Sequence, residues 1–366
     1  MTIDAPALLE GPRGRRLCLE VALAADTSGT LFARCVDAER AFHPTDGSVA
    51  TLWIGDSPDQ PLPDPVSPAE VADGLRMIDA DALAAAVRSN EALLRCLTST
   101  VDAARYWQAP DSRDQLASVD VVARALVPVA EALADAGVLA RWSEPIAAEQ
   151  WRVEFETRES DLSWPGDVRR ALAVWRSQAL RREVLHAGVH VEPGVHITGA
   201  WWSRPIELPS TAGAVAGVPA GLGLVEDGSG WELALATPAR GSGRVLELDA
   251  TVWADLCRQH PLEVTATSGA DWARATGRGG RWVVPEWSAV AAEWDAVHLS
   301  IAQYLALAGR IIDVSDGVAS LVAGWSPDCT VWLTDAVRLW GEPQPWVLEQ
   351  LDSGLVRWRP EEQPAN

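Results

Sequence analysis

The sequence contains no lysine, because arginine supplies all 30 basic residues. Without lysine the chain cannot form a Schiff base with a carbonyl substrate, and it lacks the lysine of Walker A and protein-kinase phosphate sites. No apolar run approaches the roughly 20 residues of a membrane-spanning helix. The opening residues MTIDAPALLEGPRGRRLCLE lack the apolar core of a secretion signal, so we expect a cytoplasmic protein with no membrane partner.

Basic residues are also few relative to acidic ones. The chain has 30 basic and 51 acidic residues, which gives a formal net charge of −21. A nucleic-acid interface needs a basic face, so nucleic acid is not expected as the primary ligand. The five cysteines are odd in number and widely spaced, and they form no C-x-x-C pair, which indicates reduced thiols.

Phenylalanine and tyrosine are scarce, whereas tryptophan is abundant. The chain has 3 Phe and 2 Tyr against 19 Trp, and 13 of those Trp follow residue 200. Tryptophan combines a large apolar face with an N–H that needs a partner, so it suits cores, ligand-stacking walls and interfaces.

The patterning predicts an α+β protein with a largely helical half, 1–150, and a Trp-rich, β-dominated half, 151–340. In the first half, Ser67, Pro68 and Glu70 mark a helix start. In the second half we expect a strand at 151–157 and a helix at 167–185. Further short strands are predicted at 199–203, 221–226, 230–235, 244–248, 262–266, 296–300 and 330–334. Two short helices are predicted, one at 250–259 with Asp249 as its N-cap and one at 286–293. Residues 341–366 are predicted to form a tail.

Three histidines have the spacing of a zinc-protease motif. His186, His190 and His196 are separated by four and six residues, as in H-E-x-x-H-x-x-G-x-x-H. Ala187 stands where that motif has its general-base glutamate, so the usual hydrolysis is not expected. The alternatives are a loop of solvated histidines and a structural zinc site; we predict no catalytic metal.

Several stretches resemble a set of uncharacterised proteins encoded in actinomycete genomes. The matching segments are GPRGRRLCLE (11–20), ARYWQ (104–108), WWSRP (201–205), GLGLVED (221–227), DWARATG (271–277), WVVPEW (282–287), DAVHL (295–299) and AGWSPD (323–328). They extend over nearly the whole chain. The resemblance implies a shared fold but no activity.

The order of motifs in the second half also resembles toxin-type ADP-ribosyltransferase domains. That resemblance implies NAD as a substrate, bound in a cleft between two sheets. Its wall would include Trp201, Trp202, Ser203 and Thr211, and Arg204 and Arg244 are the nearest cations by sequence. Ser300 lies two residues after His298, on the same face of the predicted strand, so the two residues are expected to share a pocket. Asp328 would stabilise the ribosyl cation, as a carboxylate does in glycoside hydrolysis, and His298 would be its catalytic neighbour.

Structural roles remain open for these residues. If 199–203 is a strand, Trp201 and Trp202 point to opposite faces, and only one can line a cleft. Arg13, Arg15 and Arg16 form a small basic cluster that is expected to be solvated. The function therefore has two alternatives: an NAD-handling ADP-ribosyltransferase or NAD glycohydrolase, active or degenerate, and a non-enzymatic interaction protein with an acidic, Trp-rich surface.

Overall fold

Helices dominate the first part of the chain. The computed structural model describes residues 2–42, 64–161, 163–187, 199–228, 230–350 and 356–361. The helices before residue 150 are α1 (Ala5–Glu10), α2 (Pro12–Ala25), α3 (Thr30–Glu39), α4 (Pro68–Arg76), α5 (Ala80–Arg88), α6 (Asn90–Asp102), α7 (Ser112–Ser118), α8 (Asp120–Ala125), α9 (Val127–Asp135) and α10 (Val138–Trp142), with a 3-10 turn at Arg40–Phe42. The predicted capping box is confirmed, because Ser67 and Glu70 each bond the other's backbone N–H.

The second part of the chain is rich in strands. The main sheet has the order β15-β14-β5-β1-β2-β12-β9-β6, with β13 paired to β5 outside this path. Its strands are β1 (Gln150–Phe155), β2 (Ser210–Ala212), β5 (Leu233–Gly241), β6 (Val245–Glu247), β9 (Ala296–Leu299), β12 (Cys329–Trp332), β13 (Val337–Leu339), β14 (Gln344–Gln350) and β15 (Val356–Pro360). A smaller sheet has the order β10-β11-β8-β7, built from β7 (Pro261–Glu263), β8 (Arg281–Pro285), β10 (Ile311–Ser315) and β11 (Val318–Leu321). β3 (Ala214–Val215) and β4 (Val218–Pro219) form a short hairpin.

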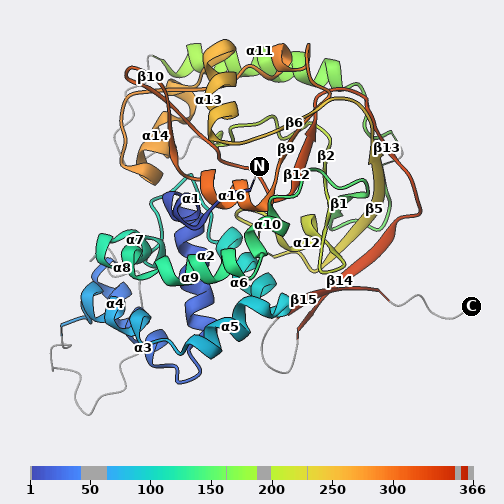
Figure 1. Ribbon diagram of the computed structural model, residues 1–366. Coiled ribbons are helices and arrows are strands. Elements are labelled where there is room, and N and C mark those ends of the chain that lie inside the picture. The colour runs from blue at the N-terminus through green and yellow to red at the C-terminus, as the bar shows by residue number, and fades with distance from the viewer. Residues whose placement is uncertain are drawn as a thin grey trace, which may run out of the picture.

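The helices of the second part lie around these sheets. They are α11 (Val168–His186), α12 (Ala220–Gly223), α13 (Ala250–Gln259), α14 (Thr265–Thr276), α15 (Trp287–Val290) and α16 (Ile301–Leu307). Figure 1 shows α11 along the edge of the molecule above α13 and α14, with α16 between the N-terminal helices and the sheets. One hydrophobic cluster joins both halves, from Leu17 and Leu97 to Trp253 and Trp325. The α+β class and the division into a helical and a strand-rich half are therefore as predicted.

Several predicted elements are confirmed and several are wrong. The predicted strands at 151–157, 244–248, 296–300 and 330–334 correspond to β1, β6, β9 and β12, and the helix expected at 167–185 is α11. Asp249 caps α13 as expected, accepting from Val252 N–H at 2.8 Å. Residues 199–203 form no strand, 221–226 begin in a short helix, and 262–266 run from β7 into α14. The segment predicted as a tail supplies β14 and β15 to the main sheet. None of the described helices is long and apolar enough to cross a membrane.

Candidate functional site

A histidine lies between two carboxylates at the end of the main sheet. His298 is on β9, and its backbone pairs with Glu247 on the parallel edge strand β6. Its ring contacts Glu247 Oε2 through Nδ1 at 2.6 Å and Asp328 Oδ1 through Nε2 at 3.2 Å. Both ring nitrogens donate only in the imidazolium form, so the arrangement selects protonated His298.

Both carboxylates are also held by backbone donors. Glu247 Oε1 accepts from Ile146 N–H at 3.0 Å, and Asp328 Oδ2 accepts from Gly213 N–H at 2.9 Å. Asp328 itself has a left-handed backbone conformation, with φ of 58°. The side chain of His298 is 0% exposed, that of Asp328 is 17% exposed and that of Glu247 is 38% exposed. The cluster therefore reaches the surface through its acidic members only.

The electrostatics of this cluster favour the charged pair. Burial by itself would lower the pKa of His298, but the hydrogen bonds with Asp328 and Glu247 and their negative charges raise it to about 9. Burial would raise the pKa of Glu247, but the hydrogen bond with His298 and the imidazolium charge lower it. His298 is thus an imidazolium at neutral pH, and its charge is balanced inside the protein.

A row of hydroxyl and amide groups continues from His298 across the sheet. Thr330 pairs with His298 on one side and with Thr211 on the other. The Oε1 atom of Gln150 accepts hydrogen bonds from both threonine hydroxyls, at 3.0 Å from Thr211 and 3.2 Å from Thr330. Trp332 Nε1 donates to Thr211 at 2.9 Å. Thr211, predicted to line a nucleotide cleft, is buried and has its hydroxyl bonded within the sheet.

The segment 201–204 braces the loop that carries Asp328. The Ser203 hydroxyl donates to Ala323 O at 2.9 Å and accepts from Ala323 N–H at 3.0 Å and Trp325 Nε1 at 3.1 Å. Arg204 Nε donates to Gly324 O at 2.7 Å. Ser203 is fully buried. These side chains, together with the backbone N–H of Ser203, which donates to Ala323 O at 2.8 Å, hold residues 323–325 in place.

The two adjacent tryptophans do not point to opposite faces. The rings of Trp201 and Trp202 stack with centroids 5.1 Å apart and an interplanar angle of 28°. Trp201 is buried, and its carbonyl accepts from Trp272 Nε1 at 2.8 Å. The prediction of alternating faces was wrong because it assumed a strand at 199–203, and alternation requires an extended, pleated backbone.

Glu226, which ends the strand predicted at 221–226, is a buried carboxyl. Its Oε2 accepts from Gly324 N–H at 2.6 Å, so it holds the same loop as Ser203 and Arg204. Burial raises the pKa of Glu226 to about 8, although the hydrogen bond from Gly324 N–H and the charges of Arg13 and Arg204 oppose the shift. The neighbouring Asp227 accepts from Arg105 Nε at 3.1 Å and Trp107 Nε1 at 2.9 Å. Three of the segments quoted for the family resemblance, 201–205, 221–227 and 323–328, thus meet at one loop, and a fourth, 104–108, contacts Asp227 beside it.

The remaining predicted residues have separate positions. Ser300 is buried and caps α16 by accepting from Gln303 N–H at 3.4 Å, whereas the ring of His298 bonds Glu247 and Asp328. His186 ends α11, whereas His190 and His196 lie outside the described residues. Within the described part of the chain, no group of three or more His, Cys, Asp or Glu side chains could hold a metal ion.

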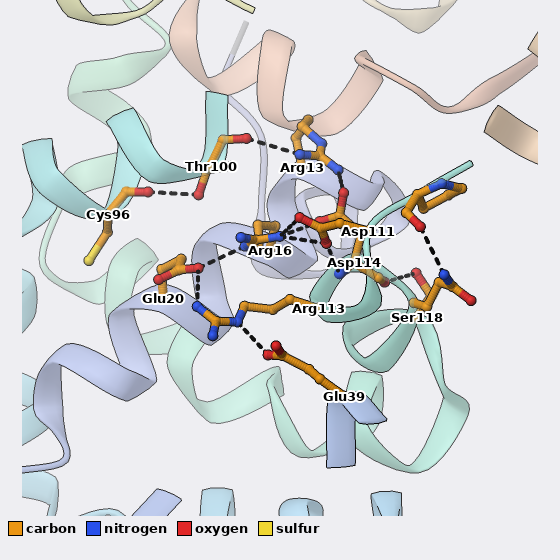
Figure 2. Close-up of polar contacts among 12 residues, drawn as sticks. Arg13, Arg16, Glu20, Glu39, Cys96, Thr100, Asp111, Arg113, Asp114 and Ser118 are labelled. Carbon is orange, nitrogen blue, oxygen red and sulfur yellow. Dashed lines mark hydrogen bonds and ion pairs between the residues drawn. The ribbon is translucent and has the colours of Figure 1, made fainter. Parts of the chain in front are cut away.

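Arg13 and Arg16 belong to a buried ion-pair network, not to a solvated cluster (Figure 2). Arg15 is partly buried and donates to the carbonyl of Leu9 at 2.8 Å. Arg13 pairs with Asp114, and both side chains are 3% exposed. Arg16 contacts Asp114 and Asp111, each at 3.0 Å. Figure 2 shows Glu20, Glu39 and Arg113 extending the network. The expectation of solvation was wrong because α2 packs against α6 and α7, so its arginines face helices and not solvent.

The sequence indicated His298 and Asp328 as candidates but not Glu247. Glu247 lies in a short strand, and only the parallel pairing of β6 with β9 places it beside His298. Comparison with family models, with curated proteins and with solved structures finds no match.

The chemistry available to this cluster is charge stabilisation. Each nitrogen of His298 already has a carboxylate partner, and the ring is inaccessible to solvent. A general base must reach the proton that it removes. The arrangement therefore holds an imidazolium in place, and of the three side chains only Glu247 and Asp328 are exposed to solvent.

Proposed function

We propose that this protein acts by binding another macromolecule through the outer face of α11, on a scaffold that the buried polar clusters hold rigid. One observation supports this proposal above the others. Of the eleven large hydrophobic residues that are exposed in the described chain, four lie on α11: Val174, Leu180, Val184 and Leu185. Val184 is 77% exposed and Leu185 is 64% exposed. Exposed apolar residues that gather on one element mark interaction sites, whereas scattered ones do not.

Helix α11 is fixed firmly to the body of the protein. Val168 and Leu172 are buried on its inner face. Near its other end, Glu183 accepts from the backbone N–H of Ala266 at 2.7 Å and of Thr267 at 2.9 Å, and so caps the start of α14. A helix held at both ends presents its outer face without a large ordering cost, which favours binding.

The side chains predicted to form a nucleotide site support this proposal indirectly. Trp201, Ser203, Thr211 and Ser300 are buried, and their polar groups bond inside the chain. The tryptophans in general pack internally; Trp253, Trp272, Trp282, Trp287, Trp325 and Trp332 are all fully buried. The binding face proposed here is therefore an arginine-rich apolar helix and not an acidic, Trp-rich surface.

A second candidate function rests on a different observation. Asp328 and His298, predicted as a catalytic pair, are in contact, and the carboxylates of Asp328 and Glu247 are partly exposed. This supports an ADP-ribosyltransferase-like domain in which Asp328 would stabilise a ribosyl cation formed from NAD. A thermal-shift titration with NAD separates the two proposals. The binding proposal expects no saturable shift, whereas a shift that persists in Asp328→Asn while nicotinamide release is lost would favour the enzyme.

A site-specific cross-link tests the binding proposal directly. A photoreactive benzoyl-phenylalanine replaces exposed Ser177, on the outer face of α11, in the full chain within its own cells. The matched control carries it at Met77, which is 81% exposed in the helical half. We expect a discrete adduct from Ser177 that disappears when Val184 and Leu185 are both changed to Asp. Equal adducts from both positions, or none from Ser177, would overturn the proposal.

A further inference from the structure

The outer face of α11 differs in charge from the rest of the protein. Residues 168–186 contain five arginines and one glutamate. The rest of the chain has 25 basic and 50 acidic residues, which is a formal net charge of −25. Glu183, the single acid, turns inward to cap α14. Among the described residues, Arg169, Arg170 and Arg181 form no ion pair, and all three are exposed. The helix is thus a local positive region on a strongly negative molecule.

Basic and apolar side chains alternate along this face. Arg170, Val174, Arg181 and Leu185 follow each other at helical spacings, and Val184 lies beside Leu185. Side chains three, four or seven positions apart share one face of a helix. At 1.5 Å per residue, α11 is roughly 28 Å long, which corresponds to a partner segment of about five turns. A complementary helix would present acidic side chains opposite the arginines and apolar ones opposite Val184 and Leu185.

From this pattern we infer that the partner of α11 is an acidic amphipathic segment of another polypeptide. The inference rests on the proposed binding function and specifies its partner. An anionic membrane or a nucleic-acid duplex is an extended surface that would also face the acidic remainder of the chain. Repulsion acts over the Debye length of about 8 Å at physiological ionic strength. A short segment contacts the helix alone and avoids that repulsion. A second copy docking α11 on α11 would place arginines opposite arginines.

Defined peptides test the inference with the full-length protein. The first probe is a fluorescent 20-residue helical peptide with leucines at i, i+4, i+7 and i+11 and glutamates on the flanks of that stripe. The second probe is a peptide of the same composition in which the order of residues is scrambled, so that the leucines no longer lie on one face of the helix. Fluorescence anisotropy is measured at 50 mM and 300 mM salt. We expect the striped peptide to bind at least about tenfold more tightly, a difference of about 1.4 kcal/mol, and to weaken as salt rises.

Variants assign the binding to the helix. Arg170→Glu together with Arg181→Glu is expected to lower the affinity for the striped peptide about tenfold or more. Each single variant, Arg170→Glu or Arg181→Glu, is compared with Arg124→Glu, a single charge reversal at an exposed position of α8 that is expected to leave affinity within about twofold. Circular dichroism shows that each variant is folded.

Three results would overturn the inference. The first is that both peptides bind with equal affinity. The second is that the protein binds phosphatidylglycerol vesicles, measured by co-sedimentation, with higher affinity than the striped peptide. The third is that the protein self-associates and that the Arg170→Glu, Arg181→Glu variant does not. If the Ser177 adduct forms but the striped peptide does not bind, the partner class is wrong and the binding function stands. If neither is observed, the binding function itself fails.

Discussion

Glu226 and Gly324 are 98 positions apart in the sequence, and the carboxylate of Glu226 accepts a hydrogen bond from Gly324 N–H at 2.6 Å. Ser203 donates to the carbonyl of Ala323 and Arg204 to the carbonyl of Gly324 itself. Residues 323–325 are thereby fixed by two distant segments, and Asp328 follows on the same loop. The position of Asp328 against His298 is therefore a consequence of long-range contacts made by side chains that are themselves buried.

Glu226 makes the stability of the protein depend on pH. Its folded pKa of about 8 lies above the ordinary value of 4.5, so the native state keeps a proton that the unfolded state releases. The contribution of protonated Glu226 to the free energy of unfolding is fully present below pH 4.5. It decreases as the pH rises toward 8, by up to about 1.4 kcal/mol per pH unit. Glu226→Gln keeps the acceptor for Gly324 and removes this loss. We expect its free energy of unfolding to exceed that of the native protein increasingly between pH 6 and pH 8, measured by urea denaturation.

Glu131→Gln, an exposed glutamate on α9, is the control for Glu226→Gln and is expected to leave the pH dependence unchanged. A Glu226→Gln variant that follows the native pH curve would show that Glu226 does not titrate upward in the fold.

His298 contributes a second, separate dependence. Its pKa is raised from 6.5 to about 9, so the stabilisation from its ion pairs is complete below pH 6.5 and is lost as the pH rises through 9. We expect an imidazole that titrates near pH 9 in histidine-selective NMR, with its resonance absent in His298→Gln. The same variant removes the imidazolium charge that lies between Glu247 and Asp328. We therefore expect a lower free energy of unfolding than that of the native protein at pH 6. An assigned His298 resonance titrating near pH 6.5 would contradict the double carboxylate contact.

Much of the architecture was predictable from local patterns. Caps placed the starts of α4 and α13, and alternation placed β1, β9 and β12, because these signals depend on neighbouring residues alone. The strand predicted at 199–203 was wrong for a physical reason. Its apolar residues are held by tertiary contacts, in which Trp201 stacks on Trp202 and Ser203 bonds Ala323, and no neighbouring strand takes part.

The site was predictable only in part. The sequence indicated His298 and Asp328 as separate candidates, and their contact depends on the loop conformation at Asp328. Glu247 was missed because β6 and β9 pair in parallel across 51 positions, and a parallel register is not visible in local sequence. The buried network around Arg13 was missed because arginine is rarely buried without partners, and those partners lie about a hundred residues away.

That network leads to a stability prediction. Asp114→Ala leaves Arg13 buried without its counter-ion, and such changes cost about 3–5 kcal/mol. Asp120→Ala removes an exposed pair with Arg124, whose side chains are 92% and 72% exposed, and is expected to change stability by less than about 0.5 kcal/mol. Both are measured by urea denaturation at pH 7. Equal effects of the two substitutions would show that the Arg13 pair is solvated.

The loop that carries Asp328 provides the sharpest test of the long-range bracing. Gly324 has φ of 74°, and a Cβ atom there would lie 2.1 Å from Trp202 Cδ1. Gly317, with φ of 69°, has no atom within 4 Å of such a Cβ atom. Gly317→Ala therefore measures the left-handed strain alone, about 1 kcal/mol, whereas Gly324→Ala adds a clash with a packed indole and is expected to cost about 3 kcal/mol or more. Because Gly324 also bonds Glu226 and Arg204, its displacement should release Asp328 from His298. The His298 resonance in Gly324→Ala should then titrate at lower pH than in Gly317→Ala. Equal stabilities and equal titrations in the two variants would show that residues 201–204 and 226 do not position the loop.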